Sequence, residues 1–436
     1  MPRSLATTQI PAAEILAVGS ELLTPFRLDT NSLYLTAELN RLGIAVRRKT
    51  IAGDELENLT EALRSACSRS PLVIVCGGLG PTADDRTREA AAAALGLRLR
   101  RQPELESQLR AWFARRDAPM PEANLRQAEL LAGAAALPNR RGTAPGQWLE
   151  RDGCILVLLP GVPAELEAMF ADAVRPRLVP YAGVAWRHEV LLLADLPESQ
   201  ADALAAPLYT AEPEVETTIL AARPGEIELH LRARGAAAAP GGALERLQDR
   251  LAAALGERLA AGQASLEAAV IQLLRRHGET LAVAESCTGG LLSARLTSVP
   301  GASQVFLGGA VAYSNLAKRS LLQVSAASLE THGAVSAAVA LELAHGARRR
   351  FGADWSLAIT GIAGPEGGTP EKPVGLVFLA CAAPQGEPQV VERRFQGGRE
   401  RVRAYAAAVA LNLLRLRLAR GERARQEAAP AARVEL

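Results

Sequence analysis

Runs of consecutive apolar residues, each ending at a glycine turn and followed by a helical pattern, most strongly restrict what this chain can fold into. Residues 71–80, PLVIVCGGLG, and 153–161, GCILVLLPG, are the clearest of these runs. Strands that lack alternation between apolar and polar residues are typical of parallel sheets buried on both faces. The sequence therefore predicts the α/β class, with a parallel sheet covered by helices on each side.

The same patterns divide the 436 residues into three folded units and a tail. We expect two three-layer α/β/α domains, at 1–178 and 263–420. A small α+β domain at 179–262, with paired strands and two helices, joins them as a connector or dimerisation domain. Residues 421–436 are charged and rich in alanine, which predicts a flexible tail.

Composition excludes several classes of protein. The 49 basic and 47 acidic residues give a net charge of +2, so direct binding of nucleic acid is not expected. The five scattered cysteines form no zinc pattern and are expected to be reduced thiols, mostly buried. The apolar runs are too short to span a membrane, and residues 1–19 lack the apolar core of a secretion signal. We therefore expect a cytoplasmic protein.

Residues 284–290, AESCTGG, place a serine at the end of a strand. Gly289 and Gly290 open the next helix, whose backbone N–H groups are suited to an oxyanion or a phosphate. Ser286 is then a candidate nucleophile, and Cys287 is its competitor. Alternatively, Ser286 only caps the helix.

A second segment, AYSNLAK at 312–318, places Tyr313 and Lys318 five residues apart. A serine hydroxyl is a poor nucleophile without a base. A lysine whose pKa is lowered by burial can act as that base, and a tyrosine hydroxyl can orient or relay the proton. Alternatively, Lys318 is a solvated residue at the start of a helix.

Two further segments are suited to a phosphate or a ribose. Residues 359–368, ITGIAGPEGG, form a glycine-rich loop that a ligand can approach closely, with Thr360 as a hydroxyl donor. Residues 395–400, FQGGRE, present Arg399 at the start of the last helix. An ordinary long hairpin is the alternative for the glycine-rich loop.

These four segments, in this order, resemble the nicotinamide mononucleotide deamidase domain, and nearly the whole chain resembles the CinA (competence/damage-inducible) family. The resemblance implies that Ser286 is the nucleophile and Lys318 its base, with Tyr313, Thr360 and Arg399 in support. The implied reaction converts nicotinamide mononucleotide into the acid mononucleotide and ammonia without a cofactor. The substrate-binding residues that it implies are Glu285, Thr288, Gly289, Gly290, Gly361, Gly364, Gly367 and Gly368.

The first domain has its own chemistry-bearing segment at 73–87, VIVCGGLGPTADDRT, which predicts a strand, a glycine loop and a helix with Asp84 and Asp85 in its first turn. Two carboxylates beside such a loop are able to hold a divalent metal bridged to a pyrophosphate. Alternatively, they only favour the helix dipole.

Together with other motifs of residues 19–166, this segment resembles the molybdopterin-binding (MoCF-like) domain that opens CinA proteins. The resemblance implies a metal-dependent ADP-ribose pyrophosphatase that yields AMP and ribose 5-phosphate. The residues it implies for nucleotide binding are Asn31, Gly77, Gly78, Gly80, Thr143 and Gly161.

The resemblance as a whole implies a bifunctional hydrolase of pyridine-nucleotide salvage and a homodimer. The chain departs from the family pattern at residues 22–25, LLTP, and at 140–141, RR, and both positions border the expected first site. One alternative is therefore an active amidase whose first domain binds a nucleotide or pterin without hydrolysis. The other is a competence or recombination adaptor without catalysis.

Overall fold

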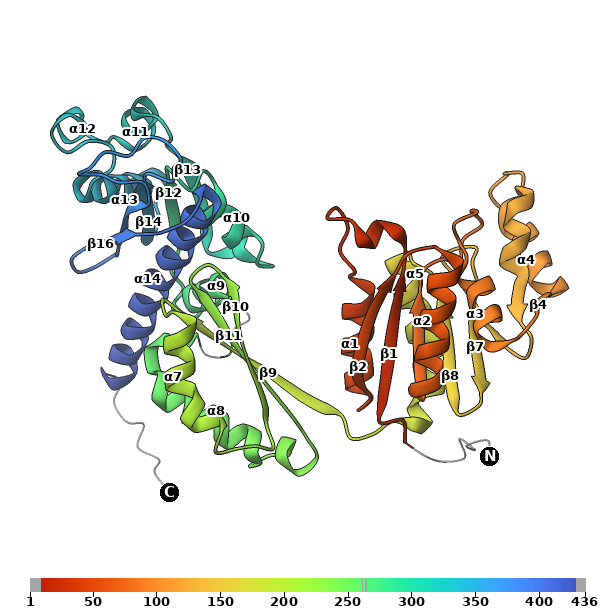
Figure 1. Ribbon diagram of the computed structural model, residues 1–436. Helices are drawn as coiled ribbons and strands as arrows, with labels where there is room; N and C mark the ends of the chain where they lie inside the picture. Colours follow the sequence, from red (N-terminus) through yellow and green to blue (C-terminus); the bar gives the residue numbers. More distant parts are fainter. Residues whose placement is uncertain (1–8, 261, 263–264, 429–436) are drawn as a thin grey trace, which may run out of the picture. The chain divides into compact units, whose positions relative to one another are not determined.

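The structure is a computed structural model that describes residues 9–260, 262 and 265–428. Its contacts divide the chain into two compact units, Met1–Trp186 and Arg187–Leu436, which are coloured red to yellow and green to blue in Figure 1. The small sheet expected as a separate domain falls within the second unit, and the predicted division into three domains stays a prediction. None of the helices in the described ranges is long and apolar enough to cross a membrane.

The first unit is built on a six-stranded mixed sheet. Four neighbouring strands are parallel, in the order β2 (Ala45–Ala52), β1 (Ala12–Val18), β3 (Leu72–Cys76) and β8 (Cys154–Leu159). The sheet continues with β7 (Gly146–Arg151), which is antiparallel to β8, and β6 (Ala135–Leu137), which is antiparallel to β7. The prediction of a parallel sheet is correct for the centre and wrong for this edge. Asp152 and Gly153 both have positive φ, as a tight two-residue hairpin requires, and this turn reverses the chain between β7 and β8.

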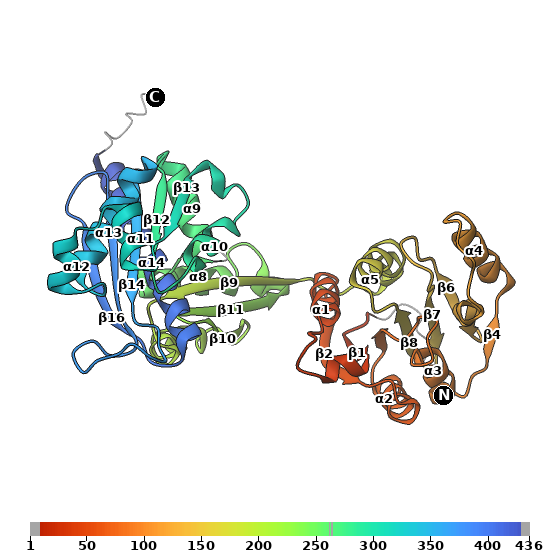
Figure 2. The same ribbon diagram turned by 90° about the horizontal axis from the view of Figure 1, so that it is seen from above.

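Helices cover both faces of this sheet, as Figure 2 shows from above. Neighbouring residues of β1 enter opposite cores, Ile15 on one face and Leu16 on the other. The helices on the first face are α1 (Asn31–Arg41) and α5 (Pro163–Met169), and those on the second are α2 (Leu56–Arg69) and α3 (Thr87–Leu95). Beside β6 and β7 lie a further helix and a two-stranded ribbon: α4 (Pro103–Ala114), β4 (Leu99–Arg101) and β5 (Glu129–Leu131).

Helix α3 begins later than the sequence predicts. Asp84 and Asp85 lie in a turn before its first residue, Thr87, and not in its first turn. A carboxylate oxygen of Asp85 accepts the backbone N–H of Thr82 at 2.9 Å, which closes this turn and delays the helix. The expectation that the helix dipole stabilises these two carboxylates from within the first turn is therefore wrong.

The second unit contains two sheets. The smaller has the order β10 (Glu216–Arg223), β11 (Glu226–Arg234) and β9 (Trp186–Ala194), and its core includes residues of α7 (Glu198–Tyr209) and α8 (Ala243–Leu255). The larger is five-stranded and mixed. Its strands β13 (Phe306–Val311), β12 (Leu281–Glu285) and β14 (Trp355–Gly361) are parallel. Strand β15 (Leu376–Ala382) is antiparallel to β14, and β16 (Gln389–Arg394) is antiparallel to β15.

Helices also cover both faces of the larger sheet. One core holds residues of α9 (Leu266–His277) and α14 (Arg399–Ala428), and the opposite core holds residues of α13 (Ala337–Phe351). Because α14 continues to Ala428, the first part of the predicted flexible tail is helical, while 429–436 lie outside the described residues. The carboxyl ends of β12, β13 and β14 share one edge of the sheet, and this brings three of the predicted site segments together.

Candidate active sites

Ser286 and Lys318 meet at the edge of the C-terminal sheet. Ser286 follows β12 directly, and its backbone N–H donates to the Ile359 carbonyl of the neighbouring strand β14 at 2.9 Å. Lys318 lies on α11 (Asn315–Leu322), which begins where the Ser314 hydroxyl accepts the backbone N–H of Ala317. The two side chains approach to 3.1 Å between Nζ and Oγ.

Burial shifts Lys318 towards its neutral form. Its side chain is only 2 % exposed, and burial lowers the pKa of the amine below its ordinary value. Nζ also donates to the carbonyl oxygens of Ala312, at 2.9 Å, and Tyr313, at 3.2 Å. A neutral amine has two N–H bonds, which these carbonyls can accept, and one lone pair, which then faces Ser286. The alternative of a solvated lysine is therefore wrong.

Glu285 lies inward and caps the next helix. It is 1 % exposed, and its carboxylate accepts the backbone N–H groups of Gly290, Leu292 and Ser293 at 2.8–3.0 Å. A negative charge at a helix N-terminus is stabilising, so Glu285 holds α10 (Leu291–Thr297) against β12. The prediction that this helix N-terminus is free to hold an oxyanion or phosphate is therefore wrong for these three donors.

The turn after Ser286 keeps two other donors. Among the described residues, the backbone N–H groups of Cys287 and Thr288 have no protein acceptor. The Thr288 carbonyl accepts two hydrogen bonds from the Arg403 guanidinium, at 2.7 and 3.1 Å. Arg403 therefore positions the turn, a role that the sequence analysis missed. Cys287 is a poor competitor as nucleophile because burial raises the pKa of its thiol to about 11.

Arg399 joins the tyrosine segment to the glycine-rich loop. Its guanidinium donates to the Tyr313 hydroxyl at 2.7 Å and to the Gly364 carbonyl at 2.9 Å. The Tyr313 side chain is 58 % exposed, so it lies at the rim of the site. The structure thus brings together Ser286, Lys318, Tyr313 and Arg399, which three separate segments of the sequence supply.

Thr360 and the glycines of the loop at 361–368 are used differently from the prediction. Thr360 is fully buried, and its hydroxyl donates to the Ala334 carbonyl at 2.7 Å, so its proton is not available to a ligand. A side chain at Gly364, whose φ is +81°, would collide with Val374 at 2.6 Å. Gly361 and Gly368 are likewise close to residues of 374–377. These glycines are therefore needed for packing of the loop itself.

A cleft of about 510 Å³ lies in the first unit, where β1, β3 and β8 end. Of the residues expected here, the lining includes Gly77, Gly78, Gly80, Asp84, Asp85, Thr143 and Gly161. Asn31 is not in the lining, but its side-chain amide donates to the Gly161 carbonyl at 2.8 Å and so positions the loop after β8.

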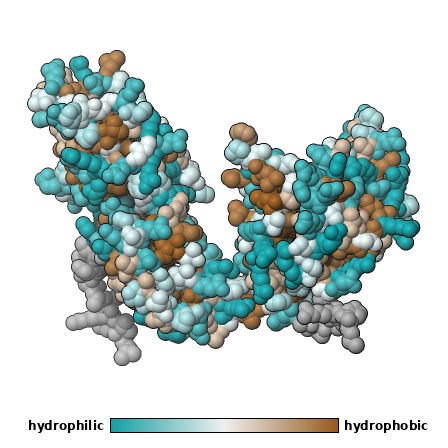
Figure 3. Space-filling view, in the orientation of Figure 1, coloured by the Kyte–Doolittle hydropathy of each residue, from teal (hydrophilic) through white to brown (hydrophobic). Residues whose placement is uncertain are grey.

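The lining also includes residues that the sequence analysis did not single out, namely Glu21, Arg27, Asp54 and Glu165. They lie in or beside the motifs of the first domain, and these motifs are the sequence signal that could have identified them. Arg27 comes from a segment with exposed apolar side chains, Phe26 (91 %) and Leu28 (86 %). Figure 3 shows apolar surface at this end of the first unit. The charged residues of the lining are mainly acidic, which disfavours a bare pyrophosphate.

The carboxylates of the cleft fit a metal that a nucleotide helps to bind. Among the residues that the structure describes, no group of three or more His, Cys, Asp or Glu side chains is arranged to hold a metal. A magnesium ion needs fewer protein ligands, because it is commonly held by one or two carboxylates together with substrate phosphates. Asp84 is exposed, and Asp85 uses one carboxylate oxygen for Thr82, which leaves the other free.

The fold and these sites define a two-unit α/β protein with a buried serine–lysine pair in its C-terminal unit and an acidic, glycine-lined cleft in its N-terminal unit. Residues 263–418 match the CinA C-terminal domain, and residues 14–179 match the probable molybdopterin binding domain. The CinA-like protein of Koribacter versatilis is 49% identical over 422 residues, which cover 93% of this chain and 99% of that protein. The CinA-like protein of Solibacter usitatus is 48% identical over 411 residues, with coverage of 93% and 98%.

The chain therefore belongs to the CinA family, with an N-terminal molybdopterin-binding-type domain and a CinA C-terminal domain. Among solved structures, the competence/damage inducible protein CihA from Agrobacterium tumefaciens is 44% identical and matches with a TM-score of 0.35. That match covers 35% of this chain and 93% of that one.

Proposed function

We propose that the C-terminal domain is a serine–lysine amidase that hydrolyses nicotinamide mononucleotide to nicotinate mononucleotide and ammonia. The observation that carries this proposal is the 3.1 Å approach of the Lys318 Nζ to the Ser286 Oγ inside a buried site, where burial lowers the pKa of the amine. A neutral lysine within hydrogen-bond reach of a serine is the arrangement that activates the hydroxyl as a nucleophile.

In the first half of the reaction, the Ser286 Oγ attacks the carboxamide carbon, and its proton passes to the Lys318 Nζ. The carboxamide oxygen becomes negative, and the backbone N–H groups of Cys287 and Thr288 are the available donors that stabilise it. The carbon–nitrogen bond then breaks, and Lys318 returns the proton to the departing nitrogen. Ammonia leaves, and the acyl group remains on Ser286 as an ester.

In the second half, a water molecule attacks the ester carbon, and its proton passes to Lys318. The bond to the Ser286 Oγ breaks, and Lys318 returns the proton to that oxygen, which restores the enzyme. The carboxylate is released as part of nicotinate mononucleotide. We assign the substrate phosphate to Arg399, whose exposed guanidinium lies at the rim beside the glycine-rich loop.

We further propose that the first domain hydrolyses ADP-ribose to AMP and ribose 5-phosphate with a divalent metal held by Asp84 and Asp85. The size of the cleft, its glycine-lined wall at the ends of three strands and its carboxylates support this assignment. The bound metal would neutralise charge on the pyrophosphate, which the acidic lining alone would repel. We also propose that the protein is cytoplasmic and forms a homodimer.

The identity of the first reaction is tested with purified full-length protein by measuring ammonia and nicotinate mononucleotide together. We expect equal amounts of both from nicotinamide mononucleotide, and far slower release of ammonia from nicotinamide, which lacks the ribose and the phosphate. Folded protein that releases no ammonia from either compound would contradict an amidase and favour a binding protein, such as a competence adaptor. The second reaction is tested by the appearance of AMP from ADP-ribose with and without Mg²⁺.

A further inference from the structure

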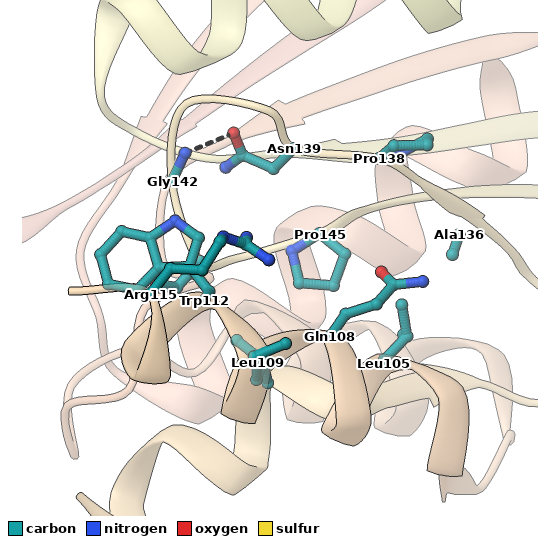
Figure 4. A pocket seen from close by; sticks show the side chains of 12 residues that line it. Leu105, Gln108, Leu109, Trp112, Arg115, Ala136, Pro138, Asn139, Gly142 and Pro145 are labelled. Carbon is teal, nitrogen blue, oxygen red and sulfur yellow. Dashed lines mark hydrogen bonds between the residues drawn. The ribbon is translucent and has the colours of Figure 1, made fainter. Parts of the chain in front are cut away.

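A second concave site lies in the first unit, between helix α4 and the loop at 138–145 (Figure 4). Its volume is about 350 Å³, and small-molecule sites commonly have roughly 300–1,000 Å³. Helix α4 supplies Leu105, Gln108 and Trp112 to one wall, and Arg115 follows its last residue. The buried residue of this helix is Leu109, so most of the surface that α4 turns towards the loop stays open to a ligand.

This pocket adjoins the acidic cleft described above. Thr143 lines both cavities, so the loop at 138–145 is the wall that they share. Asn139 holds this wall in place. The side-chain oxygen of Asn139 accepts the backbone N–H of Gly142 at 2.8 Å, and its side-chain nitrogen donates to the Glu165 carboxylate in the cleft at 2.6 Å. A ligand long enough to extend over Thr143 would therefore reach from one cavity into the other.

We propose that the pocket beneath α4 binds the aromatic base of the nucleotide whose phosphates lie in the acidic cleft. The proposal rests on the nucleotide substrate assigned above to the first domain, and it adds where the adenine of ADP-ribose is held. The ribose attached to that adenine would then lie beside Thr143.

The chemistry of the lining suits an adenine ring. The Arg116 guanidinium lies 3.6 Å from the centre of the Trp112 indole, and the Phe113 ring packs against the same indole at an angle of 71° with ring centres 5.0 Å apart. The part of the indole that lines the pocket is the surface offered to a ligand. Leu109 and Pro145 add apolar surface. Gln108 offers both a hydrogen-bond donor and an acceptor, as the edge of an adenine requires. Gln108 has no hydrogen-bond partner within the described part of the chain.

Ribose 5-phosphate is the natural control ligand, because it shares the phosphorylated ribose of AMP and lacks the base. Equilibrium binding of both compounds to the full-length protein in the presence of Mg²⁺ therefore isolates the contribution of the base. Stacking of a base on an aromatic side chain contributes roughly 5- to 100-fold in affinity. We expect the wild type to prefer AMP by a factor in this range.

In Trp112→Ala we expect this preference to fall close to one, while the affinity for ribose 5-phosphate changes by less than about twofold, since no phosphate contact is altered. Trp112→Phe should restore part of the preference. Gln108→Ala, at an exposed position, should weaken AMP binding without affecting packing. The matched control is Arg110→Ala on the same helix, because Arg110 pairs with Glu106 and does not line the pocket.

Equal AMP affinity in the wild type, Trp112→Ala and Gln108→Ala would overturn the base site, as would a wild type that does not bind AMP. The two proposals for this domain fail separately. Hydrolysis of ADP-ribose without any effect of Trp112 on AMP binding refutes the base site alone. Binding of AMP that depends on Trp112, in a protein that does not hydrolyse ADP-ribose, supports the base site and refutes the pyrophosphatase.

Discussion

Replacement of Lys318 is the sharpest test of the serine–lysine site. Lys318→Arg keeps a positive charge but cannot supply a lone pair, because the guanidinium stays protonated. Lys318→Met keeps most of the side-chain volume and removes the amine altogether. If Lys318 only provides charge, the arginine variant should retain activity and the methionine variant should lose it. If Lys318 is the base, both variants should lose it.

The expected loss follows from the contacts of the amine. A positioned base contributes roughly 10²- to 10⁴-fold to the rate, which is about 3–5 kcal/mol in the activation free energy. Removing the amine also leaves the carbonyls of Ala312 and Tyr313 without this donor. Each buried carbonyl left unpaired costs about 1–3 kcal/mol in the free energy of unfolding, and relief from burying an amine offsets part of that.

The assay is kcat/KM for release of ammonia from nicotinamide mononucleotide, combined with urea unfolding of each variant to separate lost stability from lost chemistry. Lys49→Arg is the matched control, because Lys49 is exposed and lies in the first unit. Folded Lys318→Arg protein with an activity within about tenfold of the wild type, less than the smallest loss expected for a base, would refute the role of Lys318 as the base.

Three further predictions follow from the same contacts. Because burial lowers the pKa of Lys318 and the neutral amine is the active form, kcat/KM should rise with pH and level off below the ordinary lysine pKa of about 10.4; a flat profile or a midpoint near 10.4 would contradict this. Glu285→Gln should lower the free energy of unfolding by about 1–3 kcal/mol, since the carboxylate caps α10, and should reduce kcat more than it raises KM; urea titration and steady-state kinetics measure both. Asp84→Ala should abolish Mg²⁺-dependent AMP formation from ADP-ribose and leave ammonia release unchanged; loss of both activities would point to misfolding instead.

The C-terminal site residues were grouped by the family resemblance, and the positions of their segments are consistent with that grouping. Ser286, Lys318 and Arg399 each lie within a few residues of a strand end or a helix start, and parallel strands bring such positions to one edge. The pattern gave no orientation for Glu285, which is adjacent to Ser286. Its carboxylate points back to the helix that it caps, and three spaced backbone donors decide this orientation.

The mixed parallel and antiparallel character of the first sheet was predictable from the sequence in principle. The pair Asp152–Gly153 between two apolar runs is a strong hairpin signal, but buried antiparallel and buried parallel strands have the same apolar composition. The role of Arg403 in positioning the turn after Ser286 was not predictable from the sequence, because its partner is a backbone carbonyl 115 residues away. Contacts of that kind depend on tertiary structure and leave no local pattern.

The central claim, that Ser286 is the nucleophile of a metal-independent amidase, is tested most directly by ammonia release from nicotinamide mononucleotide in the presence of EDTA. Ser303→Ala is the matched control, because Ser303 is exposed and follows Ala302 in a separate turn of the same unit. The account predicts that the wild type and Ser303→Ala retain full activity and that Ser286→Ala loses it. Activity of folded Ser286→Ala at the wild-type level, or its loss from the wild type on addition of EDTA, would contradict the account.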